Sequence, residues 1–116
     1  MIQQTQTTSF KAQLYEGVHN LLTDTIKIAL YTANADLDET TTVYTSTGEI
    51  TGTGYTSGGN TLTGANISSS GYTAYVSFNS TQWTGASFTC RGALIYNSSK
   101  GNKSIAVLDF GNDKIV

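Results

Sequence analysis

Hydrophobic and polar residues follow different spacings along this chain, and each spacing predicts a different element. Residues 1–8 are polar and have no regular period, which indicates a flexible or extended arm. From Ser9 onward, apolar residues recur at intervals of four, four and three, at Phe10, Leu14, Val18 and Leu21. This spacing predicts a helix over residues 9–22, with Ser9 as its N-cap. Gly17 falls beside the apolar stripe, where the missing side chain lets a helix approach a sheet closely.

The next segment, residues 25–33, alternates as a β-strand does. One side carries Ile26, Ile28 and Leu30, and the other carries Lys27, Ala29 and Tyr31. Shorter β-rich segments follow, separated by turn signals: TTVYT, EITGTGYTS, NTLTGANI and TAYVSFNSTQW. Short strands with frequent turns favour an antiparallel sandwich or barrel.

Six glycines lie between residues 48 and 64, in a segment that superficially resembles a phosphate-binding loop. A Walker loop requires Gly-Lys followed by Ser or Thr, and this segment contains no lysine. A dinucleotide loop requires Gly-x-Gly-x-x-Gly; Gly52 and Gly54 begin that pattern, but the third glycine, Gly58, comes one residue late. We therefore predict strand ends and hairpin turns, where glycine supplies positive φ.

The C-terminal region has the strongest pattern. Two long apolar strands are predicted over residues 86–96 and 103–110, joined by a polar turn. Gly92, inside the first strand, indicates a bulge or the close approach of another backbone. Arg91 is the sole arginine of the chain, and cross-strand reach favours an ion pair with Asp109 over a role as an interface anchor.

Together these patterns predict a mainly β fold. We expect an antiparallel β-sandwich of the jelly-roll or immunoglobulin-like kind, with one N-terminal α-helix packed on it. At 116 residues the chain is long enough for one domain with its own core, which we place at residues 9–116 after the arm.

Composition narrows the class of partner. Charged residues make up 12% of the chain and the formal net charge is -2, so nothing suggests a nucleic-acid or membrane partner. Threonine occurs twenty times and proline is absent, a bias typical of exposed β-surfaces and tight turns. The N-terminus lacks a basic region followed by an apolar run, so we expect the chain to fold in the cytoplasm.

Candidate catalytic and metal-binding residues are few. His19 is the only histidine, and helical spacing places it opposite the apolar stripe, so we expect an exposed residue. Cys90 is the only cysteine; it cannot form an internal disulfide, and we expect it to be a small buried hydrophobe. The acidic segment 36–39 lacks the spacing of a calcium loop and reads as a surface turn.

Three further carboxylates, those of Glu49, Asp109 and Asp113, have no pattern that brings them together as a glycosidase pair. We therefore predict that the protein is not an enzyme and holds neither a metal nor a cofactor.

Aromatic residues leave a binding function open. Tyrosine and tryptophan with Asn, Ser and Gly are typical of rigid surfaces that stack on ligands such as sugars. The aromatic residues concerned are Tyr55, Tyr72, Tyr75, Trp83 and Tyr96. The alternative, which we favour for Trp83, is that it closes one end of the core.

The segments IKIALYT, GYTSGGNTLTG and RGALIYNSSKGNKSIAVLDFG, after a short amphipathic helix, resemble a family of small proteins in the structural gene modules of tailed bacteriophages. The resemblance spans roughly residues 8–114 and is most specific in the C-terminal hairpin. Relatives usually continue past the DFG segment into one more apolar strand, whereas this chain stops at Val116. Either that strand is missing, or a neighbouring subunit supplies the pairing that Ile115 and Val116 begin.

The resemblance implies a virion protein that assembles with other virion proteins and acts as a homo-oligomer. Our first expectation is a capsid decoration or cement protein that binds the major capsid protein through residues 1–8, as an assembly arm, and through an oligomer interface. The alternatives are a receptor- or glycan-binding module of a tail fibre or tail tip, and a tail or neck component. Possible interface residues are Ile2, Gln3, Gln4, Tyr55, Tyr72, Trp83, Arg91, Ile115 and Val116.

Overall fold

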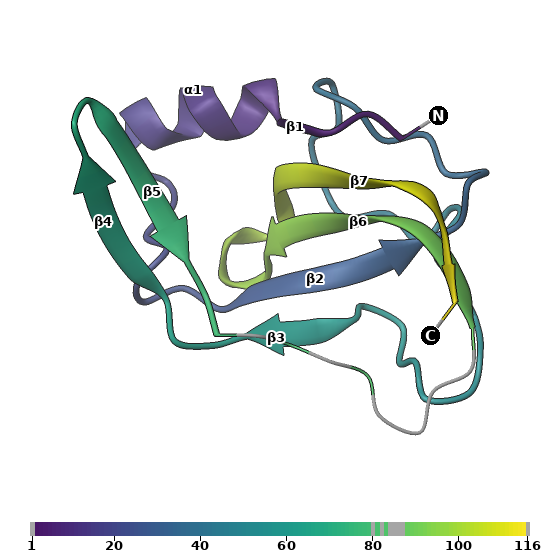
Figure 1. Cartoon of the computed structure of the whole chain (residues 1–116). Helices are drawn as coiled ribbons and strands as arrows, with labels where there is room; N and C mark the ends of the chain where they lie inside the picture. The colour runs from purple at the N-terminus through teal and green to yellow at the C-terminus, as the bar shows by residue number, and fades with distance from the viewer. Residues whose placement is uncertain (1, 80, 82, 84–87, 116) are drawn as a thin grey trace.

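Five strands form one antiparallel sheet, in the order β1-β7-β6-β2-β3, and a separate hairpin forms a two-stranded sheet, β4-β5 (Figure 1). The computed structural model describes residues 2–79, 81, 83 and 88–115. The elements are β1 (Thr5–Gln6), α1 (Thr8–Glu16), β2 (Ile26–Tyr31), β3 (Asn60–Leu62), β4 (Asn66–Ser70), β5 (Thr73–Ser77), β6 (Thr89–Asn97), the 3-10 turn η1 (Ser98–Lys100) and β7 (Lys103–Ile115). The mainly β, antiparallel sandwich with one N-terminal helix is thereby confirmed.

The long C-terminal hairpin is present as predicted, although β7 continues to Ile115 instead of ending at residue 110, and residues 86 and 87 of the predicted first strand lie outside the described residues. β6 and β7 pair along their length, and their register shifts between Cys90 and Gly92, which marks the expected irregularity at Gly92. A Cβ atom at Gly92 would lie 2.5 Å from the carbonyl oxygen of Leu108, so the close approach of backbone that we predicted is present as well. Arg91 Nε lies 3.3 Å from Asp109 Oδ1, which confirms the ion pair.

Helix α1 is shorter than predicted and begins earlier. It spans Thr8–Glu16 rather than residues 9–22, and Thr7, not Ser9, is the N-cap, because its hydroxyl accepts a hydrogen bond from the backbone N–H of Phe10. Gly17 ends the helix in the left-handed conformation, with φ of 74°. No atom lies within 4 Å of a Cβ built there, so this glycine serves as a C-cap and not as a point of close packing.

Two expectations based on the longer helix are wrong as a consequence. Of the predicted apolar stripe, only Phe10 is fully buried, and Leu14 is 47% exposed. His19 lies beyond the end of the helix and is buried, with 9% of its surface exposed, rather than standing on the solvent face.

The N-terminal residues pack on their own chain instead of forming a free arm. Ile2 is buried and forms a bridge with Leu37. The backbone N–H of Gln3 donates to the carbonyl of Leu37 at 2.8 Å, and β1 pairs with β7. The pairing of Ile115 is likewise internal, since it lies opposite Thr89 of β6. Val116 lies outside the described residues.

Two predicted strands in the middle of the chain form isolated bridges instead of ladders. Val43 of TTVYT bridges Lys103, and Glu49 of EITGTGYTS bridges Tyr31. The glycine-rich segment forms turns, as predicted. At Gly59, with φ of 80°, a Cβ would lie 1.8 Å from the carbonyl oxygen of Ile28, so only glycine fits beside β2.

The two faces of the five-stranded sheet are both apolar. We call one the closed face; it carries Ala29, Tyr31, Leu94, Tyr96 and Val107, all buried. Ile2, Ala35 and Leu37 complete that core cluster, and Tyr44 packs against it. We call the other the groove face; its strand residues are Ile26, Ile28, Leu30, Leu62, Cys90, Ala93, Ile95, Ala106, Leu108 and Phe110. Cys90 is buried there, as expected.

Candidate functional site

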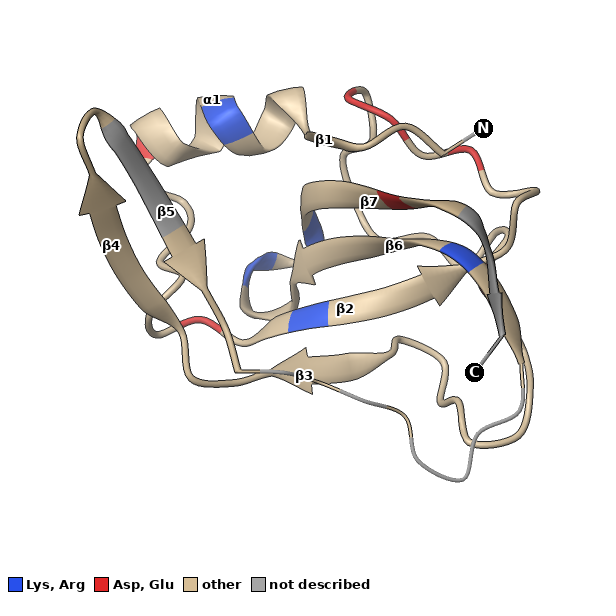
Figure 2. Ribbon diagram, in the orientation of Figure 1, with Lys and Arg blue, Asp and Glu red and all other residues tan. Residues whose placement is uncertain are grey.

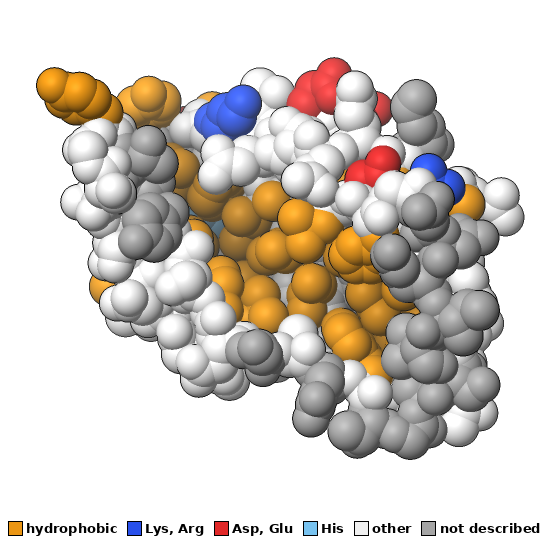
Figure 3. Space-filling model, viewed as in Figure 1, with side chains coloured by type: hydrophobic (Ala, Val, Ile, Leu, Met, Phe, Trp, Pro, Cys, Tyr) orange, Lys and Arg blue, Asp and Glu red, His pale blue; other side chains and the backbone are white. Residues whose placement is uncertain are grey.

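An apolar groove lies on the groove face of the sheet. Its volume is about 440 Å³. In Figure 3 it is visible as a hollow of hydrophobic side chains below α1 and beside the β4-β5 hairpin. The lining residues are Gln6, Phe10, Leu14, Leu21, Ile67, Val76, Phe78, Ile95, Ile105 and Ala106.

Three parts of the chain build this groove. The floor comes from β6 and β7, where Ile95 faces Ala106 across the ladder. One wall is α1, held against the sheet by Phe10, which packs with Ile26 and Ile105. The opposite wall is the β4-β5 hairpin, which stands away from the sheet in Figure 1.

The hairpin wall holds its position through few contacts. Its base is closed by the backbone N–H of Asn79, which donates to the carbonyl of Thr63 at 2.7 Å. Ile67, which faces the groove from β4, is 52% exposed, whereas core residues of comparable size are almost fully buried. A two-stranded hairpin alone is only marginally stable in water. This wall therefore presents apolar surface that a partner can cover.

The groove is also free of charge. No residue between Glu49 and Arg91 is charged, and that stretch includes β3, the whole hairpin and three of the ten residues that line the groove. Figure 2 shows the charged residues on α1, on β2, β6 and β7, and on the loops. Because no ionic group offers recognition inside the groove, a ligand there would bind through buried apolar area and shape.

A second, polar hollow lies where the N-terminal residues meet β6 and β7. It has a volume of about 510 Å³ and is lined by Ile2, Gln3, Gln4, Ala33, Arg91 and Asp109. The structure thus brings together four of the predicted interface residues, those at positions 2–4 and 91. The Gln4 side-chain oxygen accepts a hydrogen bond from the backbone N–H of Asp109 at 3.2 Å. The Gly111 backbone N–H, and then Arg91, lower the pKa of the Asp109 carboxyl.

The predicted aromatic residues are not assembled into one surface. Tyr72 is fully exposed beside the turn that joins β4 to β5. Trp83 instead packs against the core with Tyr55, the two rings being stacked with centroids 6.3 Å apart. Tyr96 is buried on the closed face, and nothing is described for the side chain of Tyr75.

Tyr55 belongs to a hydrogen-bonded group around Glu49. Both Tyr44 and Tyr55 donate their hydroxyl protons to the Glu49 carboxylate, and the backbone N–H of Gly58 donates to it at 2.8 Å. Burial, and then the bond to Glu49, raise the pKa of both phenols. The two phenols therefore stay protonated at neutral pH, and the group holds the loop after β2 in place.

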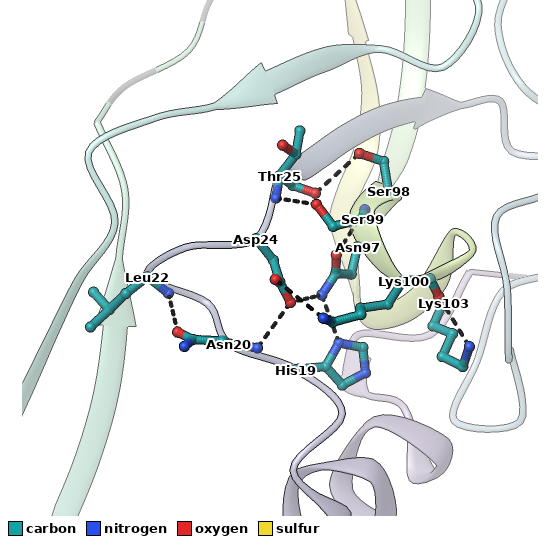
Figure 4. Close-up of polar contacts among 10 residues, drawn as sticks. All are labelled: His19, Asn20, Leu22, Asp24, Thr25, Asn97, Ser98, Ser99, Lys100 and Lys103. Atoms are coloured by element: carbon teal, nitrogen blue, oxygen red, sulfur yellow. Dashed lines mark hydrogen bonds and ion pairs between the residues drawn. The ribbon is translucent and has the colours of Figure 1, made fainter.

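Another buried polar group was not foreseen from the sequence. It surrounds His19 and joins the segment after α1 to the end of β6 (Figure 4). His19 was expected on the surface because the helical period was extended past Gly17. The residue that ends the helix, Gly17, was the available signal, since glycine at that position commonly stops a helix.

The groove residues were also missed as a site, although all of them except Gln6, which was placed in the N-terminal arm, were assigned to a strand or to the helix. Their signal in the sequence is twofold: apolar residues on both faces of the C-terminal strands, and the long uncharged stretch before them. Neither pattern shows that the covering segment leaves a gap.

Within the described part of the chain, no group of three or more His, Cys, Asp or Glu residues is placed to hold a metal ion. No helix in that part is both long and apolar enough to cross a bilayer. The chain matches no protein-family model, no curated protein and no solved structure.

Proposed function

We propose that this protein is a non-catalytic structural component of a bacteriophage virion that binds another virion protein through its apolar groove. The observation that carries the proposal is the uncharged groove between α1 and the β4-β5 hairpin, whose apolar lining is open to a partner. The sequence resemblance to phage structural proteins supplies the biological setting.

Burial of groove side chains supplies the free energy of such an interaction. Each Å² of apolar surface removed from water contributes roughly 25 cal/mol. A protein that binds the assembled shell but not its loose subunits stabilises the shell by mass action. We therefore propose a decoration or cement protein whose partner is the major capsid protein. No observation favours the glycan-binding alternative, because its aromatic residues are spread between the hairpin tip and the core.

The test is co-sedimentation of the purified protein with emptied, expanded phage capsids. Removing residues 1–8 would be a poor probe, because Ile2 and β1 belong to the fold. A point substitution is cleaner. Ile67→Asp places a charge in the groove at a half-exposed position, and Ser70→Asp places the same charge on the same strand, outside the groove lining.

We expect saturable binding of the wild type and of Ser70→Asp, and binding weakened about tenfold or more by Ile67→Asp, because the new charge must be desolvated. Circular dichroism should show that both variants are folded. Equal weakening by both variants would rule out the groove as the contact. No binding of the wild type, with retention on host cells instead, would place the protein in the tail.

A further inference from the structure

A buried hydrogen-bond chain connects α1 to the end of β6 through His19. His19 Nε2 lies 2.8 Å from Gln13 Oε1, and His19 Nδ1 lies 2.9 Å from Asn97 Nδ2. Asn97 also contacts Asp24, which forms an ion pair with Lys100 at 3.6 Å (Figure 4). We call these residues the His19 chain.

The orientation of the Asn97 amide follows from its other two partners. Asn97 Oδ1 accepts from the backbone N–H of Ser99 at 3.0 Å, and only an oxygen can do so. Asn97 Nδ2 donates to Asp24 Oδ2 at 2.8 Å, and a carboxylate oxygen requires a donor. Rotating the amide by 180° would break both contacts, so the nitrogen must face His19.

The tautomer of His19 follows in turn. Because an NH₂ group faces Nδ1, that ring nitrogen must accept and carries no proton. The proton is then on Nε2, which donates to Gln13. Every polar contact in this chain is satisfied by neutral histidine and by no other form of the ring.

We propose that His19 is a proton-operated latch, which holds α1 and the following segment against β6 when neutral and releases them when protonated. Adding a proton to Nδ1 sets an N–H against the NH₂ of Asn97, so two donors face each other and the link is lost. The proton comes from solvent, and no other chemistry is needed.

The groups that face His19 determine the pH at which it takes up the proton. Burial is the main cause that lowers its pKa below the ordinary value of 6.5. The Asp24 carboxylate opposes this effect, while Lys103 of β7 and Lys100 of η1 add to it. From α1 the contacts are uncharged: the amide of Gln13 and the ring of Phe10, whose centroid is 5.1 Å from that of His19.

The sign of the pH dependence follows from that lowered pKa. The unfolded chain takes up a proton near pH 6.5, before the folded chain does. The stabilisation by neutral His19 is therefore complete above pH 6.5 and is lost as the pH falls through the lower, folded value. Phe10 both contacts His19 and lines the apolar groove, so mild acid should loosen that wall of the groove.

The first experiment uses the fact that the chain has a single histidine, so its imidazole signals in an NMR spectrum are unambiguous. We expect the Nε2–H tautomer at about pH 8 and a titration midpoint below the ordinary value of about 6.5. The Nδ1–H tautomer, or a midpoint at or above that value, would overturn the proposal.

The second experiment measures backbone hydrogen exchange in residues 8–25, at about pH 8 and about pH 5, corrected for intrinsic rates. In the wild type we expect protection to fall about tenfold in acid, which corresponds to the loss of one buried hydrogen bond. His19→Gln, which cannot titrate, should lose this dependence. An equal fall in the wild type and in His19→Gln would exclude the latch.

The matched variant is Asn97→Asp, which replaces the facing donor with an acceptor and, because Asn97 also donates to Asp24, places two carboxyl groups in contact there. Protonated His19 then gains a partner, so the NMR midpoint should rise above that of the wild type. This variant remains informative if His19→Gln does not fold. A midpoint unchanged or lowered in Asn97→Asp would show that the Asn97 amide does not control the proton on His19.

Discussion

On the closed face of the sheet, Leu94 and Val107 are completely buried, whereas on the groove face their chain neighbours Ile95 and Ala106 are only half-buried. The two pairs come from the same strands and have the same apolar character. They differ in what covers them: the N-terminal residues and the loop after β2 cover the first pair, whereas the second pair lies in the groove between α1 and the β4-β5 hairpin.

This difference gives the two surfaces different roles, because one stabilises the fold and the other is available for binding. The covered face holds the fold together, because its side chains have left water completely. The groove face is partly buried as well, at Ile26, Leu30 and Ala93. Its uncovered part, around Ile95 and Ala106, retains apolar surface that a partner can bury. The following substitutions break or sharpen that comparison, in order of decreasing expected effect on the free energy of unfolding.

The largest effect should come from truncating the closed face. Leu94→Ala removes a fully buried side chain and should lower the free energy of unfolding by about 2–5 kcal/mol, since a cavity remains. Ile95→Ala, one residue along the same strand, should cost about 1 kcal/mol, because the side chain is already partly hydrated. Urea denaturation measures both. Equal losses would mean that the two faces are equally well packed.

A smaller effect is expected where the N-terminal residues meet the closed face. In Gly92→Ala the new methyl group would lie 2.8 Å from Ile2 Cγ2 and 2.5 Å from the Leu108 carbonyl, so it should cost about 1–3 kcal/mol. Thermal unfolding gives the loss, and faster proteolysis near Ile2 locates it. Gly17→Ala is the control: it has open space, and only the left-handed strain of about 1 kcal/mol applies.

A hydrogen bond from the Tyr96 hydroxyl holds the loop that covers the closed face. The Tyr96 hydroxyl donates to the carbonyl of Gly58 at 2.6 Å, so Tyr96→Phe should cost about 1 kcal/mol. Tyr72→Phe should have no measurable effect, because Tyr72 is fully exposed on the hairpin. Paired denaturation curves test this, and a comparable loss in Tyr72→Phe would contradict it.

The same phenol predicts an alkaline limit to stability. Burial, and then the neighbouring Tyr44 and Glu49, raise the pKa of Tyr96 to about 12. Since an unfolded tyrosine ionises near pH 10, this stabilisation is complete below about pH 10 and is lost as the pH rises through 12. Absorbance of tyrosinate should show a step that coincides with unfolding. Complete ionisation near pH 10 with the fold intact would refute it.

The smallest effect on stability should come from the groove wall. Ile67→Ser changes a half-exposed side chain of the detached hairpin and should alter the free energy of unfolding by no more than about 0.5 kcal/mol. Capsid binding should nevertheless weaken. A loss of several kcal/mol in denaturation experiments would show that the hairpin is part of the stabilising core.

The C-terminal hairpin could be predicted closely because its information is local. Two long apolar strands, a polar turn, the irregular Gly92 and the Arg91–Asp109 pair all follow from alternation and cross-strand distance. The helix was predicted too long, because periodicity was given more weight than the capping tendency of Gly17. Because of that error, His19 was predicted on the solvent-exposed side of the helix, whereas it lies in a buried hydrogen-bond chain.

The candidate site was not predictable in the same way. In the sequence, the residues of the groove look like ordinary core positions. The predicted interface residues were instead mainly in the N-terminal segment and among the aromatic side chains. Ile2, Gln3, Gln4 and Arg91 do surround one hollow, but they do so because β1 pairs with β7, a contact between distant parts of the chain. No local pattern reports such a pairing.

The amino-acid sequence by itself determined that this chain forms antiparallel strands with one N-terminal helix, because alternation, turn residues and apolar period act over a few neighbouring positions. The tertiary structure alone decided which part of the apolar sheet surface is left uncovered. That outcome depends on where the N-terminal segment, the loop after β2 and the β4-β5 hairpin come to lie, and these placements are set by packing between residues far apart in the chain.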